Sequence, residues 1–369
     1  MAPPADYFQR YNLTDGDSQL DRSGDNVRED FMNVIYNIAP TQTPFMTGIG
    51  RGTSKDVFTS WQQDDIEEPN SANAALDGAD IGADVSAKAR RVGNINQIST
   101  KSLLVTGRSE AVDKAGRSSE MSYQLAKAAK ALKRDMEAIL TGNQAAAIGD
   151  VDTNPSTTAG LRACYRDAIA DTQEVTSALA NTGSTGANGG VNPGTTSVPA
   201  AATDAAATRA MSETLLRSAI EACYINGGEP DTIMVTPTMK TVLSTYLFTS
   251  SARVAALYSD VGNKRSDGGA AAQGSVDIYI SDFGALKIVP NRFLGYNTTA
   301  HAPRNRDVHV LDMSLWATSY LRSFRTINVA KSGDAEKRLL LVDYMLQYRQ
   351  EMGSGGVFDV DETTPMVAA

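Results

Sequence analysis

An apolar segment broken by two prolines constrains the fold of this chain more than any other stretch. The segment YNIAPTQTPFMTGIGR covers residues 36–51, and its prolines are Pro40 and Pro44. Each proline removes a backbone donor and pushes the residue before it into an extended conformation, so the segment cannot form one helix. We call it the strap. Its neighbours in the sequence are mostly polar, so we expect a surface from elsewhere to cover it.

The residues before the strap are predicted to form a polar arm. Residues 1–35 are charged and poor in core-forming side chains, and the arm ends in the short amphipathic stretch VREDFMNVIYNI. The apolar side chains of this stretch recur at helical spacing, which indicates one apolar side. They are Val27, Phe31, Val34, Ile35 and Ile38.

The segment after the strap is predicted to form a long β-hairpin. From Lys55 onward, DVFTSW alternates its side chains as a strand does, and residues 92–107 are typical of a returning strand. Residues 64–90 between them form an acidic loop of small residues. Asparagines and glutamines occur on both faces, so we expect the hairpin to have no core of its own.

The clearest helix is predicted at residues 118–142, where a stripe of apolar side chains steps by three or four residues. The stripe consists of Met121, Leu125, Ala128, Leu132, Met136 and Ile139. The opposite side carries Lys127, Lys130, Lys133 and Arg134. Gly142 follows at the position where glycine commonly ends a helix.

A low-complexity segment and a compact α/β section follow the helix. Residues 171–210 are rich in Gly, Ala, Thr and Ser, which predicts an exposed insertion. The α/β section has predicted helices at 212–228 and 236–247, with a buried strand at 231–235. Thr236 and Pro237 are typical of the N-cap and first position of a helix. Residues 276–290 are predicted to form two strands about a tight turn.

The last section, residues 307–360, is predicted to contain long strands. Within KRLLLVDYMLQYRQEM, four bulky side chains alternate along the chain, which favours a strand over a helix. They are Val342, Tyr344, Leu346 and Tyr348.

Charge and composition exclude several classes of protein. The chain of 369 residues has a net charge of −9, which argues against a protein whose main task is to grip nucleic acid. Cys164 and Cys223 are expected to be buried free thiols, although a disulfide between them stays open. MAPPADYFQR lacks the apolar core of an export signal, and no run approaches the length of a membrane helix. We therefore expect a cytoplasm-like compartment and no membrane anchor.

The sequence offers no convincing catalytic, cofactor-binding or metal-binding residues. His301 and His309 are eight residues apart, which fits neither a zinc helix nor a zinc finger. Asp282-Phe283-Gly284 matches a kinase motif only by chance, because its partner motifs are absent. GIGRG, residues 48–52, lacks the strand–turn–helix context of a phosphate loop. We predict no cofactor and no enzymatic activity.

A run of carboxylates supplies the one enzymatic alternative. Asp64, Asp65, Glu67 and Glu68 would have to act as the acid and base of a hydrolase. They have no apolar neighbours that would raise a carboxyl pKa, so a solvated run of charge is the preferred interpretation.

The order of these segments resembles the α+β fold of major capsid proteins of tailed bacteriophages of the Hong-Kong-97 type. Three stretches carry the resemblance, which spans about residues 25–358. They are REDFMNVIYNIAPTQTPFMTGIGR at 28–51, WQQDDIEEPNSANAALDGAD at 61–80 and GGEPDTIMVTPTMKTVLSTY at 227–246. The insertion at 171–210 departs from a minimal member of the family.

The resemblance implies a division of the chain into five parts. Residues 1–54 would form the N-terminal arm, and 55–107 the extended β-hairpin loop that overlaps a neighbouring subunit. Residues 108–210 would form the peripheral domain, with a spine helix at 118–142 and the insertion at 171–210. The axial domain would cover 211–300, and 301–369 would return to the peripheral domain and end in a tail. Strap and hairpin would then be completed by other subunits.

The resemblance also implies a function and a set of partners. The chain would self-assemble as hexamers and pentamers into an icosahedral capsid that encloses double-stranded DNA. Its partners would be copies of itself, a portal, a separate scaffolding protein, possible decoration proteins and packaged DNA bound without sequence preference. Assembly would take place in the host bacterial cytoplasm, and the product would be the virion capsid. A cellular nanocompartment shell of the same fold, enclosing a cargo enzyme, is the alternative.

Overall fold

The computed structural model describes residues 32–64, 66, 69–74, 76–78, 89–150, 152–165, 198–202, 208–249, 276–296, 306–331 and 333–362. The α-helices are α1 Pro44–Gly48, α2 Gly107–Ala111, α3 Glu120–Leu140, α4 Glu213–Ile225 and α5 Pro237–Thr249, and short 3-10 turns lie at Arg162–Cys164, Met313–Leu315 and Glu351–Gly353. The strands are β1 Gly50–Thr53, β2 Phe58–Gln63, β3 Arg90–Ile95, β4 Gln97–Thr106, β5 Thr232–Val235, β6 Ile278–Ser281, β7 Gly284–Pro290, β8 Val308–Leu311, β9 Trp316–Val329, β10 Ala335–Tyr348 and β11 Gly355–Val357.

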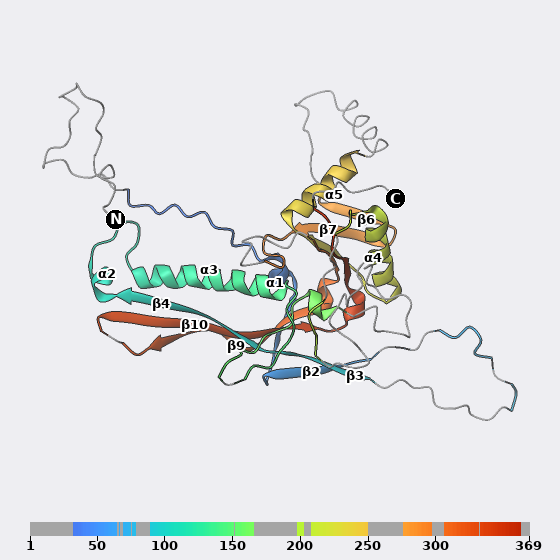
Figure 1. Cartoon of the computed structure of the whole chain (residues 1–369), viewed down its shortest axis with the longest axis horizontal. Coiled ribbons are helices and arrows are strands. Elements are labelled where there is room, and N and C mark those ends of the chain that lie inside the picture. The colour runs from blue at the N-terminus through green and yellow to red at the C-terminus, as the bar shows by residue number, and fades with distance from the viewer. Residues whose placement is uncertain are drawn as a thin grey trace, which may run out of the picture.

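A four-stranded sheet and the helix α3 form the elongated part of the molecule (Figure 1). The strand order is β1-β9-β10-β4, and β9 and β10 are antiparallel strands of 14 residues each. The helix lies along one face of this sheet and buries Met121, Ala128, Leu132 and Met136. The predicted helix at 118–142 is therefore observed, with Ser119 as its N-cap.

A second, mixed sheet has the strand order β11-β8-β5-β7-β6. Strand β5 is parallel to β7 and antiparallel to β8, and the helices α4 and α5 lie beside this sheet in Figure 1. Leu216, Ile220 and Cys223 of α4 belong to its core. The predicted N-cap of α5 is confirmed, because the Met239 N–H donates to Thr236 Oγ1 at 3.3 Å.

The alternation predicted in the last section is confirmed. Val342, Tyr344, Leu346 and Tyr348 of β10 are all buried in the core under α3. Because every second side chain of a strand points to one face, this alternation fixes which face of β10 meets the helix.

Two predictions about the N-terminal segments are wrong. Residues 32–43 run as extended chain, so the helical spacing of Val34, Ile35 and Ile38 does not produce a helix. The returning strand predicted at 92–107 is two strands separated at Asn96, because β4 pairs with β10 rather than with β2. Alternation alone does not specify the partner of a strand.

The insertion predicted at 171–210 lies largely outside the described residues, but its later part is docked. Ala202 exchanges two hydrogen bonds with the side chain of Asn143, at 2.7 and 2.8 Å. The Ala146 N–H donates to the Pro199 carbonyl at 3.0 Å. Residues 198–202 are therefore held against the chain that follows α3, contrary to a wholly exposed insertion.

Candidate assembly surfaces

The second half of the strap is anchored in the chain's own core. Pro44 begins α1, as expected for a residue that lacks the N–H left unpaired at a helix start. Phe45 is fully buried with its ring 6.3 Å from that of Trp316, and Met46 and Ile49 are buried with it. The expectation that other subunits cover the whole strap is therefore wrong for residues 45–49.

A buried carboxylate of α3 holds this anchor. Glu137 accepts the N–H of Phe45 at 2.8 Å and of Met46 at 2.9 Å, which satisfies two unpaired donors at the start of α1. Asn291, just after β7, donates its side-chain amide to the same carboxylate at 2.8 Å. One side chain thus joins the strap, α3 and the end of β7.

The environment of Glu137 also changes its protonation. The residue is fully buried, and this loss of hydration raises the pKa of its carboxyl to about 7. The hydrogen bonds from Met46, Phe45 and Asn291 act in the opposite direction, because they stabilise the charged form. Burial has the larger effect.

The first half of the strap and the end of the arm remain uncovered. Met32, Val34, Tyr36 and Ile38 are exposed, and Ile38 has no cover at all, at 102% relative exposure. Figure 1 shows residues 32–43 running along α3 on the side away from the sheet. Among the residues that the structure describes, these side chains form an apolar row without a partner.

Both ends of this exposed segment are fixed to the body. At one end Gly116, just before α3, donates its N–H to the side chain of Asn33. At the other end Glu137 holds Phe45. Twelve extended residues reach about 40 Å at ~3.3 Å each. A helix of 21 residues spans about 32 Å. The segment is therefore long enough to follow α3 from end to end.

The base of the hairpin is also anchored, which corrects the prediction that the hairpin has no core. Strands β2 and β3 pair in antiparallel register, and Val92 and Ile95 of β3 are buried. The ring of Trp61 lies 5.0 Å from that of Tyr348 in an edge-on arrangement. Asn94, fully buried, donates to the Leu346 carbonyl of β10 at 2.7 Å.

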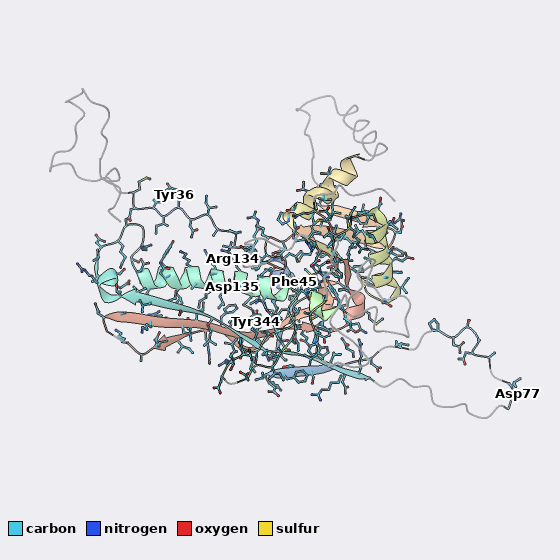
Figure 2. The ribbon with its side chains drawn as sticks, viewed as in Figure 1. Tyr36, Phe45, Asp77, Arg134, Asp135 and Tyr344 are labelled. Carbon is cyan, nitrogen blue, oxygen red and sulfur yellow. The ribbon has the colours of Figure 1, made fainter. Side chains whose placement is uncertain are left out.

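The described part of the hairpin beyond these strands projects from the body. Figure 2 shows Asp77 at the far end of the projection, and both Asp64 and Asp77 are exposed. Asp65, Glu67 and Glu68 lie outside the described residues. Of the four proposed hydrolase carboxylates only Asp64 is described, and it is an exposed side chain.

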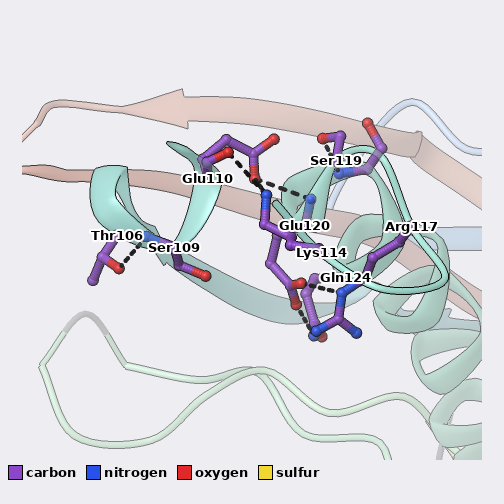
Figure 3. Close-up of polar contacts among 9 residues, drawn as sticks. Thr106, Ser109, Glu110, Lys114, Arg117, Ser119, Glu120 and Gln124 are labelled. Carbon is purple, nitrogen blue, oxygen red and sulfur yellow. Dashed lines mark hydrogen bonds and ion pairs between the residues drawn. The ribbon is translucent and has the colours of Figure 1, made fainter. Parts of the chain in front are cut away.

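The turn between α2 and α3 is a network of caps and ion pairs (Figure 3). Ser119 caps α3 through the Ser122 N–H at 3.3 Å, and Glu110 accepts the Glu120 N–H at 2.9 Å. Glu120 in turn accepts from Gln124 at 2.7 Å. The hydrogen bonds that Glu110 accepts, the largest effect being that of Ser119, lower the pKa of its carboxyl. An open groove of about 390 Å³ lies beside the network. Most charged side chains of the network are paired with one another, which suits a rigid connection between α2 and α3.

The two histidines do not form a site. His301 lies outside the described residues. His309 is buried on β8, and its Nδ1 is 3.0 Å from the Tyr165 hydroxyl. The ring of His309 stacks on that of Tyr165 and meets that of Phe358 edge-on, so this histidine is part of the core.

The remaining sequence motifs have structural places. Asp282 and Phe283 form the turn between β6 and β7, where Asp282 pairs with Arg217 at 2.6 Å. Gly284 has a φ of 152°, which favours glycine there. Residues 48–52 connect α1 to β1, which pairs with β9.

Both cysteines are free and buried, as predicted. Burial raises the pKa of the Cys223 thiol to about 12 and that of Cys164 well above its usual value, so neither is activated. Within the described ranges, no group of three metal-ligating side chains comes together. No described helix combines the length and the apolar character needed to cross a bilayer.

The arrangement of these parts defines a class. Solved structures that are similar to this chain include the capsid of a native GTA particle. That match has a TM-score of 0.55 and 8% identity, and it covers 94% of this chain and 99% of the other. The capsid of Cyanophage A-1(L) gives 0.54 and 12% identity over 90% and 97%, and Gordonia phage Cozz gives 0.51 and 12% over 93% and 92%. The fold is the Hong-Kong-97-type capsid fold, as the sequence predicted.

The family can be stated more narrowly. The family model described as SU10 major capsid protein matches residues 8–361, and the chain belongs to this family. It is also 31% identical over 115 residues to the major capsid protein of Escherichia phage Phieco32, a match that spans about a third of that relative's length (33%). The protein is a structural subunit of a phage capsid shell, and no comparison favours a nanocompartment shell.

Proposed function

We propose that the chain assembles as hexamers and pentamers into an icosahedral shell around double-stranded DNA, and that its exposed arm and projecting hairpin make the contacts between copies. The observation that carries the proposal is the exposed apolar row of residues 32–38. Its segment is fixed at Asn33 and at Phe45, yet no described residue of the chain covers the row. Contiguous exposed apolar side chains of this kind mark surfaces where proteins bind one another.

The proposed division of labour follows the segments of the chain. Residues 1–54 act as the arm, 55–107 as the extended loop, 211–300 as the axial domain, and 108–210 with 301–369 as the peripheral domain. A separate scaffolding protein, a portal and decoration proteins are the further partners in the host cytoplasm. The capsid membership of the family supports this proposal.

A loop replacement tests the role of the hairpin. Residues 66–88 are exchanged for a short Gly/Ser turn, which leaves the Trp61–Tyr348 contact and the paired strands in place. We expect the subunit to keep its circular dichroism spectrum and its urea midpoint but to form no shells in electron micrographs. Stable shells from this variant, or an unfolded subunit, would refute the intersubunit role.

A single substitution tests the arm. Ile38→Ser removes a fully exposed apolar side chain, so the subunit should stay as stable as wild type while shells form poorly or dissociate. Ile148→Ser is the matched control, because Ile148 is also exposed, at 68%, but lies outside the arm. Equal assembly of both variants would contradict the proposal.

A further inference from the structure

We propose that the solvent-facing side of α3, through Lys127, Lys130 and Lys133, is the surface that faces the packaged DNA and contacts its phosphates without reading sequence. This inference rests on the proposed function, because it requires a shell that holds DNA.

The three lysines share one side of the helix. Successive steps of three residues in a helix of 3.6 residues per turn keep them within about a third of its circumference. They lie opposite the stripe of Met121 and Leu132 that packs on the sheet. All three are exposed.

Two other lysines of the chain are neutralised by a nearby carboxylate. Lys101 pairs with Asp135 at 2.5 Å, and Lys240 pairs with Asp277 at 2.7 Å. Among the described residues, no ion pair or hydrogen bond engages the side chain of Lys127, Lys130 or Lys133. Three uncompensated ammonium groups therefore stand in a row of about 9 Å at 1.5 Å per residue.

No carboxylate of α3 opposes a polyanion on this side. Glu120 is bound to Gln124, and Glu137 is buried under α1. Asp135 pairs with β4, and Figure 2 shows Arg134 on the arm side of α3 and Asp135 on the sheet side. The arm that runs beside the helix, residues 32–43, contains no charged residue.

The chemistry of this surface fits a DNA backbone rather than base edges. Lysine ammonium groups on flexible stems act as point charges for phosphates. Arg134, which could form a bidentate fork, instead lies over the ring of Phe293 at 5.0 Å. Over about 9 Å a DNA duplex presents about five phosphates, enough to engage all three lysines.

The distribution of charge in the rest of the chain points the same way. The chain has a net charge of −9, and much of this negative charge is concentrated in segment 64–84, which contains seven carboxylates and no basic residue. Like charges repel, so the hairpin is a poor surface to place against DNA. The lysine side of α3 avoids this repulsion.

Lysine footprinting of wild-type particles tests the proposal. Filled particles and particles emptied of DNA are treated with an acetylating reagent, and the modified lysines are measured by mass spectrometry. We expect Lys127, Lys130 and Lys133 to be labelled several-fold less in filled than in emptied particles. Equal labelling in both would overturn the proposal. Protection that persists without DNA would also overturn it and would indicate a protein partner, such as the acidic hairpin of another copy.

A charge reversal provides the second measurement. The variant Lys127→Glu/Lys130→Glu/Lys133→Glu should form shells but lose packaged DNA, measured as the ratio of absorbance at the DNA and protein maxima. The control reverses Lys55 and Lys287, which are also exposed and belong to other segments of the chain. Normal DNA content in the α3 variant, or failure to form shells at all, would count against the proposal. Failure of the wild type to form shells would instead refute the proposed function.

Discussion

Replacing Glu137 by glutamine should remove a pH dependence from the stability of the subunit. The carboxyl has a pKa of about 7 when folded, against a reference value of 4.5. Between these values the folded state holds a proton that the unfolded state has released, so the stability that this group contributes falls as pH rises. A shift of about 2.5 units corresponds to about 3 kcal/mol at most, at 1.36 kcal/mol per unit.

The variant keeps the shape of the side chain and has no proton to release. At pH 5 the folded wild-type carboxyl is protonated, and both of its oxygens can still accept the N–H groups of Phe45 and Met46. The glutamine NH₂ group cannot accept a hydrogen bond, so the variant should be less stable than wild type at this pH by about 1–3 kcal/mol. From pH 5 to pH 8 the wild type should lose up to about 3 kcal/mol relative to the variant, with the change complete above the folded pKa.

Urea unfolding of unassembled subunits at pH 5, 6, 7 and 8 measures this difference. Taking wild type minus variant at each pH cancels every other titrating group that the two proteins share. Glu110→Gln is the control, because the pKa of that exposed carboxyl is lowered rather than raised and lies below this window. A difference between wild type and Glu137→Gln that stays constant from pH 5 to pH 8 would refute the assigned effect of burial.

Three further substitutions test the anchors of the strap and hairpin. Leu132→Ala empties a fully buried position under α3 and should cost about 3 kcal/mol of unfolding free energy in urea; a loss below 1 kcal/mol would contradict tight packing there. Trp61→Ala should cost at least the ~1 kcal/mol of its aromatic pairing with Tyr348 and speed hydrogen exchange in β2, whereas unchanged exchange would show that the contact does not hold the hairpin. Gly93→Ala would place a Cβ 2.7 Å from Phe58, so β2 and β3 should exchange faster than in wild type, and normal protection would show that the strands adjust without loss.

Local periodicity accounts for the parts of the fold that the sequence predicted. The 3.6-residue stripe of α3 and the alternation of β10 both record burial on one side, and both elements are observed. The cap at Thr236 is likewise a signal carried by adjacent residues. These patterns can be recognised in a short stretch of sequence without knowing which distant residues pack against it.

The anchors of the strap and hairpin depend on contacts that no local pattern contains. Glu137 is 92 residues from Phe45, and nothing in the sequence distinguishes it from a solvated glutamate except its position beside the buried Met136. Asn94 gave a misleading signal, because a polar side chain in a strand suggests exposure, whereas here it donates to a carbonyl of β10. Buried polar groups are stable when they are fully hydrogen-bonded, and only tertiary structure supplies those partners.

Fixing the arm at both ends has a consequence for assembly. A free arm would lose the conformational freedom of each ordered residue when a neighbour binds it, at about 1–2 kcal/mol per residue for the backbone. Residues 34–44 lie between the contacts of Asn33 and Phe45, so much of this cost is met when the subunit folds. Binding of a second copy to the exposed Tyr36 and Ile38 then gains apolar burial against a smaller entropic cost. In the shell that we propose, the buried half of the strap would thus present the exposed half to a neighbour.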